Sequence, residues 1–478
     1  MRDEHMKTPN ILVIMSDDQG PWAMHCAGTA ELHTPNLDRI ASEGIRFENF
    51  FCASPVCSPA RASFLTGRMP SQHGVHDWIK HGNMEDSSGK TWHGPEESIE
   101  YLEGLTGFTD ILAQNGYTCG LSGKWHLGAS DVPQKSHDFW CSHALGGDSY
   151  TDYWVFDNNT KMTHKTQYVT DFFTDRAIDF LSEQKFAKQP FCLSVHYTAP
   201  HSPWRQEEQP PDIWNMYADS EFSLPIEKVN PWKGWNPSSD QRRETIQGYY
   251  TTITAMDRAI GRILDHLDNT GLAEDTLVIF TSDNGYSLGH HGIMGKGNGT
   301  YPLNMFEESV KVPFIVRLPG VTQGGEVNLE LLSHYDVMPT LLDYLNLDTS
   351  SNEILPGKSF APLLKGSDLD GSRESVVICD EYGPNRMLRT REWKYIQRYP
   401  NGPDELYDLV NDPQERINLT DDVEFKNRQQ SMSKELEEWF QRYVIDQLDG
   451  SKLTMCRGGG QKGALRNNSH TDELFDSN

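Results

Sequence analysis

The sequence predicts an α/β fold: a large mixed, mostly parallel sheet flanked by helices, with a smaller C-terminal subdomain made of an antiparallel sheet and a helix. Short apolar runs that suit buried strands alternate with amphipathic helical patterns, which is typical of parallel sheets. The strand-like runs are residues 10–15, 118–122, 191–195, 275–280 and 312–316. Beyond residue 368 the pattern changes, because 387–396 and 405–409 suggest an antiparallel pair and 425–448 a helix.

Helix signals fill the gaps between these runs. A helix is expected from Pro35 to Ile40, since Thr34 suits an N-cap, Pro35 the first turn and Gly44 the stop. Further helices are expected around residues 109–114 and over 245–267. Residues 204–240 are rich in proline, tryptophan and charge, which indicates an irregular insertion of the kind that often carries function.

These patterns divide the chain into three parts. We expect a catalytic α/β domain over residues 1–368, a subdomain over 369–450, and a polar, flexible tail over 451–478.

The charge balance excludes some partners. The chain has 42 basic and 69 acidic residues, a net charge of −27, so a nucleic acid or an anionic membrane would be repelled. If the substrate is an anion, positive charge must be concentrated in a small pocket. That favours small esters or chain ends over a groove that grips a long polyanion.

No targeting or membrane segment is visible. The start is charged and the apolar run 11–15 is too short for a signal peptide, so the chain as written is expected to be cytoplasmic, or periplasmic or exported if a signal was removed. No stretch is long and apolar enough for a membrane span. The eight cysteines lack the paired spacing of a zinc or disulfide framework. The oligomeric state is not determined by these patterns.

Two acidic pairs follow strand-like runs. Asp17 and Asp18 come after the first run, and Asp283 and Asn284 after the run that ends at residue 280. Ligands gather at the carboxyl ends of parallel strands, and side-chain oxygens suit a hard cation such as Ca²⁺ or Mg²⁺. The alternative is that each pair caps a turn or helix. Their matching placement favours the metal site.

Cys57 is predicted to lie at a helix N-terminus. Pro59 suits the first turn, an apolar run follows, and Gly67 ends it. Free backbone amides at such a position favour negative charge, so Cys57 could be a nucleophile. The alternative, a buried inert cysteine, is the commoner case for an isolated thiol.

Four basic residues lie at ends of apolar runs or in a glycine-rich loop: Lys124, His126, His201 and Lys296. Taken singly, each is more often a surface or packing residue than a catalyst. Their shared placement makes them candidates.

Together these segments resemble the sulfatase family, the formylglycine-dependent type I sulfatases of the alkaline-phosphatase superfamily. The most specific piece is residues 57–61, Cys-Ser-Pro-Ala-Arg, followed by Thr-Gly-Arg at 66–68. The segments 34–39, 123–128, 200–201 and 282–285 stand in family order, and 405–419 is similar to the family's ending. The resemblance covers residues 9 to about 419.

The resemblance implies a role for each matched residue. Oxidation by a formylglycine-generating maturation enzyme would convert Cys57 to formylglycine (3-oxoalanine), whose hydrate is the nucleophile. The implied Ca²⁺, with Mg²⁺ the less favoured ion, would be held by Asp17, Asp18, Asp283, Asn284 and the modified Cys57. Arg61 and Lys124 would hold the hydrate, His126 would take its proton, and His201 and Lys296 would bind sulfate, one of the two protonating the leaving alcohol.

Several functional readings stay open. The leading one is a sulfuric ester hydrolase acting on a sulfated carbohydrate. Its rivals are a phosphodiester or phosphonate monoester hydrolase of the same superfamily and a calcium-dependent binder of sulfated glycans without catalysis. Sugar recognition is suggested by aromatic residues in predicted loops, of which Trp204 is the proposed substrate contact. The others are Trp78, His81, Tyr150, Trp154 and Trp235. The alternative is that these rings simply pack the loops.

Overall fold

The computed structural model describes residues 8–79, 99–158, 162–348, 353–371, 373–399, 402–453 and 460–467. His81 lies outside the described residues. Among the described residues, no helix has the length and apolar composition needed to cross a membrane.

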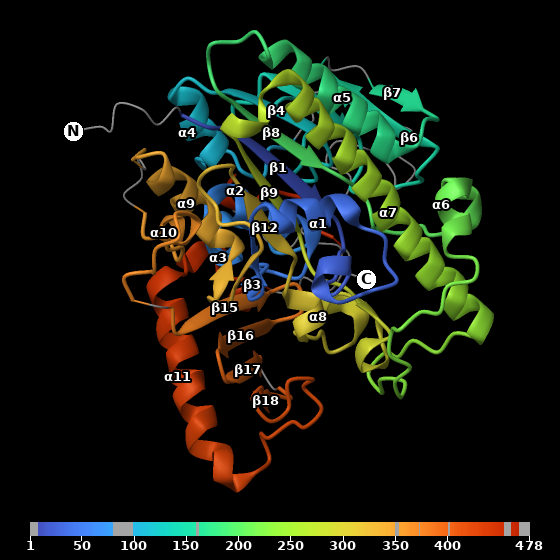
Figure 1. Cartoon of the computed structure of the whole chain (residues 1–478). Helices are drawn as coiled ribbons and strands as arrows, with labels where there is room; N and C mark the ends of the chain where they lie inside the picture. The colour runs from blue at the N-terminus through green and yellow to red at the C-terminus, as the bar shows by residue number, and fades with distance from the viewer. Residues whose placement is uncertain are drawn as a thin grey trace.

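A ten-stranded sheet forms the centre of the molecule (Figure 1). Its core, β9-β1-β8-β4-β5, is parallel, whereas β12 runs antiparallel to β9 and β2, and β6 and β7 extend the far edge antiparallel. In spatial order the strands are β13 (Glu326–Asn328), β2 (Ile45–Phe47), β12 (Phe314–Arg317), β9 (Thr276–Ser282), β1 (Asn10–Ser16), β8 (Phe191–His196), β4 (Thr118–Gly123), β5 (Phe139–His143), β6 (Tyr153–Asp157) and β7 (Met162–Lys165). The predicted mixed, mostly parallel sheet is confirmed.

Both faces of the sheet are covered by helices, because side chains of a strand alternate between its two sides. Leu12 and Ile14 of β1 pack with the helices of one face: α1 (Pro35–Ser42), α5 (Val169–Gln184) and α7 (Ser239–Thr270). Ile11, Val13 and Met15 face the other side, towards α2 (Cys57–Thr66), α4 (Phe108–Gln114), α9 (Val337–Tyr344) and α10 (Ala361–Leu364). Each strand of the centre is therefore buried on both sides.

Short elements connect this frame. They are β3 (Phe50–Phe51), β10 (Ser287–Leu288), β11 (Met294–Gly295), β14 (Leu332–Ser333), α3 (Pro70–His73), α6 (Pro211–Met216) and α8 (Glu307–Val310). The helix α6 lies within the predicted irregular insertion.

The C-terminal subdomain is a four-stranded antiparallel sheet of β15 (Ser375–Asp380), β16 (Asn385–Thr390), β17 (Trp393–Arg398) and β18 (Glu405–Asp408). The helix α11 (Lys426–Tyr443) packs on it through Met432, Leu436 and Phe440 (Figure 1). The stretch 387–396, expected to be one strand, is a hairpin instead. Its turn is closed by the Trp393 amide, which donates to Thr390 Oγ1 at 2.9 Å.

Two helix ends differ from expectation. The helix α7 begins before residue 245, because Ser238 and Gln241 cap it reciprocally: the Gln241 amide donates to Ser238 Oγ at 3.3 Å, and the Ser238 amide to Gln241 Oε1 at 3.0 Å. The helix α11 ends at Tyr443, short of residue 448.

Part of the region expected to be a flexible tail is packed. Gln461 is fully buried, and its backbone amide donates to Trp78 O at 2.8 Å. Leu465 is also buried and joins Leu448 in a small apolar cluster. The buried backbone of 460–461 pairs with residues 77–79, which explains why this polar segment is held.

Candidate active site

The two acidic pairs meet because β1 and β9 run parallel and in register. Ser16 lies opposite Ser282, so the residues that follow each strand emerge side by side. The Asp18 amide donates to Asp283 Oδ1 at 3.2 Å, and Asn284 Nδ2 donates to Asp18 Oδ1 at 2.8 Å. Asp18 adopts a φ of 62°, which turns the chain sharply after the strand. The sheet thus gathers three carboxylates and an amide at one edge.

Cys57 is the first residue of α2, and its helix ends at Gly67, which has a φ of 66°. Its Sγ lies 3.5 Å from Asp17 Oδ1. The sulfur and one oxygen each from Asp17, Asp18 and Asp283 all lie within 4.8 Å of one another. Three buried carboxylates in such a set suit a hard divalent cation, so the residues present fit the metal that the sequence implies.

Three cationic side chains surround this acidic set. Arg61 donates from Nε and Nη2 to Asp283 Oδ2, at 3.0 and 2.8 Å. Lys124 pairs with Asp17. Lys296 donates to Asp18 Oδ1 at 2.5 Å and to Cys57 Sγ at 2.8 Å. All six charged groups are buried, so each offsets the desolvation of its partner.

Burial and the neighbouring charges shift the pKa values of Asp283 and Cys57. Burial would raise the pKa of Asp283, but Arg61, Lys124 and Lys296 outweigh it and hold that pKa below its ordinary value. Burial and the neighbouring Asp17 raise the pKa of Cys57 to about 12. The unmodified thiol is therefore protonated at neutral pH and is a poor nucleophile, since the thiolate is the reactive form.

His126 lies at the edge of this cluster in a fixed orientation. It has a φ of 54°, and its Nε2 lies 3.1 Å from Ile79 O. A carbonyl only accepts, so Nε2 carries the proton and donates, leaving Nδ1 as the acceptor. Nδ1 is buried and has no hydrogen-bond partner among the described residues. Burial, with the charges of Lys124 and Arg61, holds the pKa of His126 well below its ordinary value. The ring is therefore a neutral base with a free Nδ1.

His201 lies on the solvent side of the cluster. Its Nε2 is 3.8 Å from Asp18 Oδ2, and its Nδ1 donates to Ser202 O at 2.7 Å. The Tyr150 hydroxyl donates to the His201 carbonyl at 2.7 Å and fixes the backbone there. His201 is half-buried and so can meet a ligand entering from solvent.

Lys296 is held by its own loop. Asn304 Nδ2 donates to the carbonyls of Lys296 and Gly297, at 2.9 and 3.1 Å. This clamp keeps the ammonium beside Asp18 and Cys57 although the loop is glycine-rich.

Among the described residues, no hydrogen bond or ring contact joins Trp204 to the charged cluster. Its half-buried ring meets Tyr249 and Tyr286 edge-on, at 5.6 and 5.7 Å between centroids, and its Nε1 donates to Pro200 O at 2.7 Å. These contacts support the alternative that Trp204 packs its loop. The sugar contact stays a prediction.

Three features of the site were missed from the sequence. Ile79 contacts His126 through its backbone carbonyl, which every type of residue has, so the sequence does not reveal it. Gly146 and Gly147 lie against the two histidines, since a Cβ on Gly146 would be 2.2 Å from His126 Nε2 and one on Gly147 would be 3.2 Å from His201 Cε1. A glycine pair is a signal for such close approach. Asp380 comes from the C-terminal subdomain and lies beside Gly297.

Two family models and several known proteins match this chain. The Sulfatase family model matches residues 9–347, and a model described as N-sulphoglucosamine sulphohydrolase, C-terminal, matches residues 301–442. The chain is 27% identical to an N-acetylglucosamine-6-O-sulfatase of Bacteroides thetaiotaomicron, over 95% of this chain and 90% of the relative. It is 30% identical to an ulvan-active sulfatase of Formosa agariphila, over 91% and 81%.

Solved structures share the fold. A protein solved in complex with its substrate D-glucosamine-2-N,6-O-disulfate has a TM-score of 0.78 at 25% identity, with 93% of this chain and 100% of the other covered. A phosphonate monoester hydrolase of Agrobacterium radiobacter has a TM-score of 0.70 at 20% identity, with 91% of this chain and 96% of the other covered.

Proposed function

Because the chain belongs to the sulfatase family, whose model matches residues 9–347, we propose that it releases sulfate from a sulfated carbohydrate, with residue 57 as the nucleophile after oxidation to formylglycine. One observation carries the proposal. Cys57 lies where three carboxylates and three cations meet, with the Lys296 ammonium 2.8 Å from its sulfur.

The buried state of the thiol supports the need for modification. A group with a pKa of about 12 is not ionised at neutral pH, so the genetically encoded side chain is a weak nucleophile. A hydrated aldehyde at the same position offers two hydroxyl groups, one to attack sulfur and one whose deprotonation expels sulfate. The maturation enzyme that the family implies would supply the oxidation.

Asp17, Asp18, Asp283, Asn284 and residue 57 would hold the cation, for which we propose Ca²⁺. When bound, such an ion supplies Lewis-acid stabilisation of charge on the sulfate oxygens. Lys124 and Lys296 pair with two of these carboxylates, those of Asp17 and Asp18.

The remaining side chains act on charge and protons. Arg61 and Lys124 hold residue 57 in place, while Lys296 and His201 stabilise negative charge on the sulfate oxygens. His126, neutral and with a free Nδ1, accepts a proton from residue 57 when sulfate leaves. His201 is the group nearest solvent, which suits protonation of the departing alcohol.

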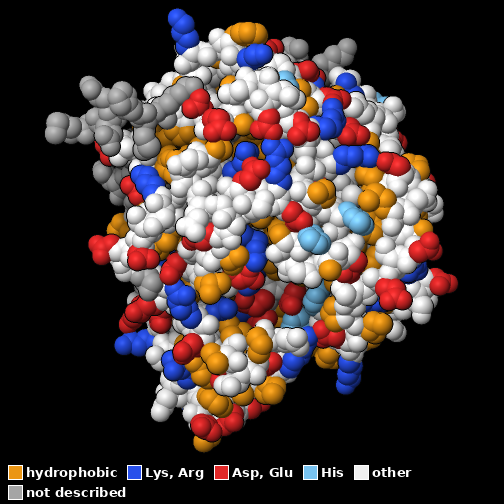
Figure 2. Space-filling view, viewed as in Figure 1, with side chains coloured by type: hydrophobic (Ala, Val, Ile, Leu, Met, Phe, Trp, Pro, Cys, Tyr) orange, Lys and Arg blue, Asp and Glu red, His pale blue; other side chains and the backbone are white. Residues whose placement is uncertain are grey.

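The surface charge supports a small anionic group as the target. On the face seen in Figure 2, acidic and basic side chains are interspersed, whereas three cations converge inside the site. The two relatives described above are named for N-acetylglucosamine 6-O-sulfate and for ulvan, which supports a carbohydrate substrate.

The proposal is tested by comparing turnover of 4-nitrophenyl sulfate with that of a phosphodiester and a phosphonate monoester analogue. Faster sulfate ester cleavage is expected, and its loss on removal of divalent cations with EDTA should be reversed by calcium. The reverse substrate preference under every condition would favour the phosphonate hydrolase alternative, whose representative shares the fold. Binding of sulfated sugars without any turnover would favour the non-catalytic binder.

Sugar specificity is tested separately, by measuring sulfate release from a panel of defined sulfated mono- and disaccharides. We expect at least one sugar sulfate to be cleaved with a higher kcat/KM than 4-nitrophenyl sulfate.

A further inference from the structure

Asp18, one of the residues that would hold the cation, lies in a sharp turn that follows β1. Its φ of 62° is in the left-handed region, which a residue with a side chain seldom adopts unless its surroundings hold it there. The direction of the Asp18 carboxylate depends on this backbone conformation. A group that holds the turn therefore also holds the carboxylate beside Asp283 and Asn284.

The end of β9 holds two amides of this turn. The Asp18 amide donates to Asp283 Oδ1 at 3.2 Å, and the Gln19 amide donates to Ser282 Oγ at 3.1 Å. Both bonds use amides of the turn, and neither uses the carbonyl of Asp18.

Tyr249 of the helix α7 holds the rest of the turn. Its hydroxyl donates to the Asp18 carbonyl at 2.8 Å and accepts from the Gly20 amide at 3.1 Å. Burial holds the pKa of Tyr249 well above its ordinary value, so the hydroxyl keeps the proton that it donates. One side-chain oxygen thus bridges the two residues on either side of Gln19.

Aromatic neighbours fix the ring of Tyr249. The ring is fully buried, and Trp204, Tyr286 and Trp22 lie against it, at 5.6, 5.7 and 5.7 Å between centroids. Because a packed interior leaves little free space, the hydroxyl cannot leave the turn unless these rings repack. Tyr249 is therefore a rigid support for the backbone around Asp18.

We propose that Tyr249 is a positioning residue for the cation: its hydroxyl keeps the Asp18 carboxylate in the orientation that binds the ion. This inference rests on the proposed function and deepens it by naming a residue outside the acidic set on which the calcium affinity depends. Without the hydroxyl, only a fraction of the chains would hold the turn in its binding conformation. The apparent Kd would then rise in inverse proportion to that fraction.

The test is Tyr249→Phe, which removes the hydroxyl and keeps the ring. Calcium binding to the full-length protein, freed of divalent cations, is measured by isothermal titration calorimetry. The net contribution of one buried hydrogen bond corresponds to about a three- to tenfold change in an equilibrium constant, and we expect the Kd to rise by that factor. Added calcium should also stabilise the variant less than the wild type in denaturant unfolding.

The matched control is Tyr250→Phe, on the next residue of the same helix. Tyr250 is also fully buried and belongs to the same apolar cluster as Tyr249, but its hydroxyl donates to Glu31 Oε1, at 3.1 Å. This control loses a hydrogen bond and keeps its ring, and it should bind calcium as the wild type does.

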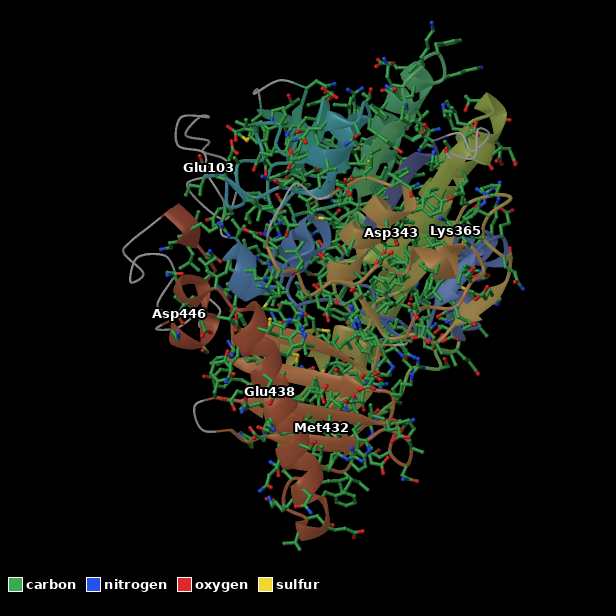
Figure 3. All side chains as sticks on the ribbon, turned by 90° about the vertical axis from the view of Figure 1, so that its left-hand side faces the viewer. Glu103, Asp343, Lys365, Met432, Glu438 and Asp446 are labelled. Carbon is green, nitrogen blue, oxygen red and sulfur yellow. The ribbon has the colours of Figure 1, made fainter. Side chains whose placement is uncertain are left out.

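A second control addresses weak calcium binding by surface carboxylates, since the chain has a net charge of −27. Asp343 on α9 is exposed and paired with Ser359 (Figure 3). Asp343→Asn should leave the Kd unchanged.

Activity gives an independent readout. If Tyr249 acts through the ion, excess calcium should restore kcat for 4-nitrophenyl sulfate in Tyr249→Phe to nearly the wild-type value, because saturating ligand draws all chains into the binding conformation. The preparations are matched for the fraction of formylglycine, which intact-protein mass spectrometry measures.

The outcomes are distinguishable. An unchanged Kd in Tyr249→Phe, or an equal rise in Tyr249→Phe and Tyr250→Phe, would overturn the inference. A loss of kcat that excess calcium does not correct would also overturn it and indicate a structural role. A wild type that binds no calcium would overturn the inference and the proposed cation together. Calcium binding without turnover of any sulfate ester would overturn the proposed function alone, because the comparison of Kd values does not depend on turnover.

Discussion

The imidazole of His126 donates from Nε2 to the carbonyl of Ile79, at 3.1 Å. That one contact fixes the ring's tautomer and turns Nδ1 into the acceptor. Ile79 is itself held at its amide, which donates to Ser58 Oγ at 3.0 Å, next to the nucleophile position. The backbone of Ile79 therefore contacts both His126 and Ser58, the residue that follows the nucleophile position.

Gly146→Ala is expected to displace His126. The added methyl group would lie 2.2 Å from Nε2, so the ring has to move and lose Ile79. Because misplacement by about 1 Å can cost about 100-fold in rate, we expect kcat for 4-nitrophenyl sulfate to fall by about 10- to 100-fold. Gly147→Ala should lower kcat less, because its added methyl group would be 3.2 Å from the nearest atom, which belongs to His201. Unchanged kcat in Gly146→Ala would contradict the tautomer argument.

Cys57→Ala is expected to abolish turnover, because it removes the side chain that lies where the carboxylates and cations meet. In the wild type, specific activity should track the fraction of chains in which intact-protein mass spectrometry detects replacement of the thiol by an aldehyde. Cys26→Ala is the control, a half-buried cysteine paired through its backbone with Asp38. A fully active preparation with an intact thiol would refute the mechanism.

Asp283→Ala is expected to destabilise the protein strongly. The substitution removes the carboxylate that accepts two hydrogen bonds from the buried Arg61. Removing one member of a buried ion pair typically lowers the free energy of unfolding by about 3–5 kcal/mol. Denaturant unfolding should detect the loss, and added calcium should stabilise this variant less than the wild type. Asp265→Ala removes an exposed partner of Arg39 and should cost less than about 1 kcal/mol. Similar losses in both variants would contradict the described burial of the cluster.

Gln461→Ala is expected to loosen the segment that carries Ile79. The buried Gln461 side chain accepts from the His76 amide at 2.9 Å and donates to Gly74 O at 3.0 Å. Its removal should lower kcat by several-fold with KM little changed, since His126 would lose a rigid support. Lys462→Ala, an exposed neighbour, is the control. A chain shortened after residue 459 with full activity would show that this segment does not support the site.

Stability is expected to fall in mild acid. Burial lowers the pKa of His334 from 6.5 to about 4, so between these values the unfolded state binds more protons than the folded state. The free energy of unfolding then decreases as the pH falls from 6.5 to 4, by about 1.4 kcal/mol per pH unit for one such group. Unfolding curves at pH 7 and pH 5 should measure this, and His334→Gln should reduce the slope. An unchanged slope would exclude His334 as a contributor.

The sequence by itself determined the fold class and named the residues that the structure brings together in the acidic and cationic cluster. The β1 and β9 runs and the acidic pairs behind them are local patterns, as are Cys57 before a proline and the glycine that ends its helix. Such features are encoded by residue type and order over a few positions, so they are visible without coordinates.

Only the tertiary structure decided how these groups are oriented and supported. The N-terminus of α1 illustrates the reason. Thr34 occupies the predicted cap position, but its side chain makes no capping hydrogen bond. The amides of Asn36 and Leu37 donate instead to the carboxylate of Asp257 on α7. Ile79 likewise orients His126 through a backbone carbonyl, and Gln461, from the C-terminal part of the chain, holds the segment that carries Ile79. Backbone groups carry no residue identity, and contacts between distant segments depend on how the layers pack, so neither is readable from a single sequence.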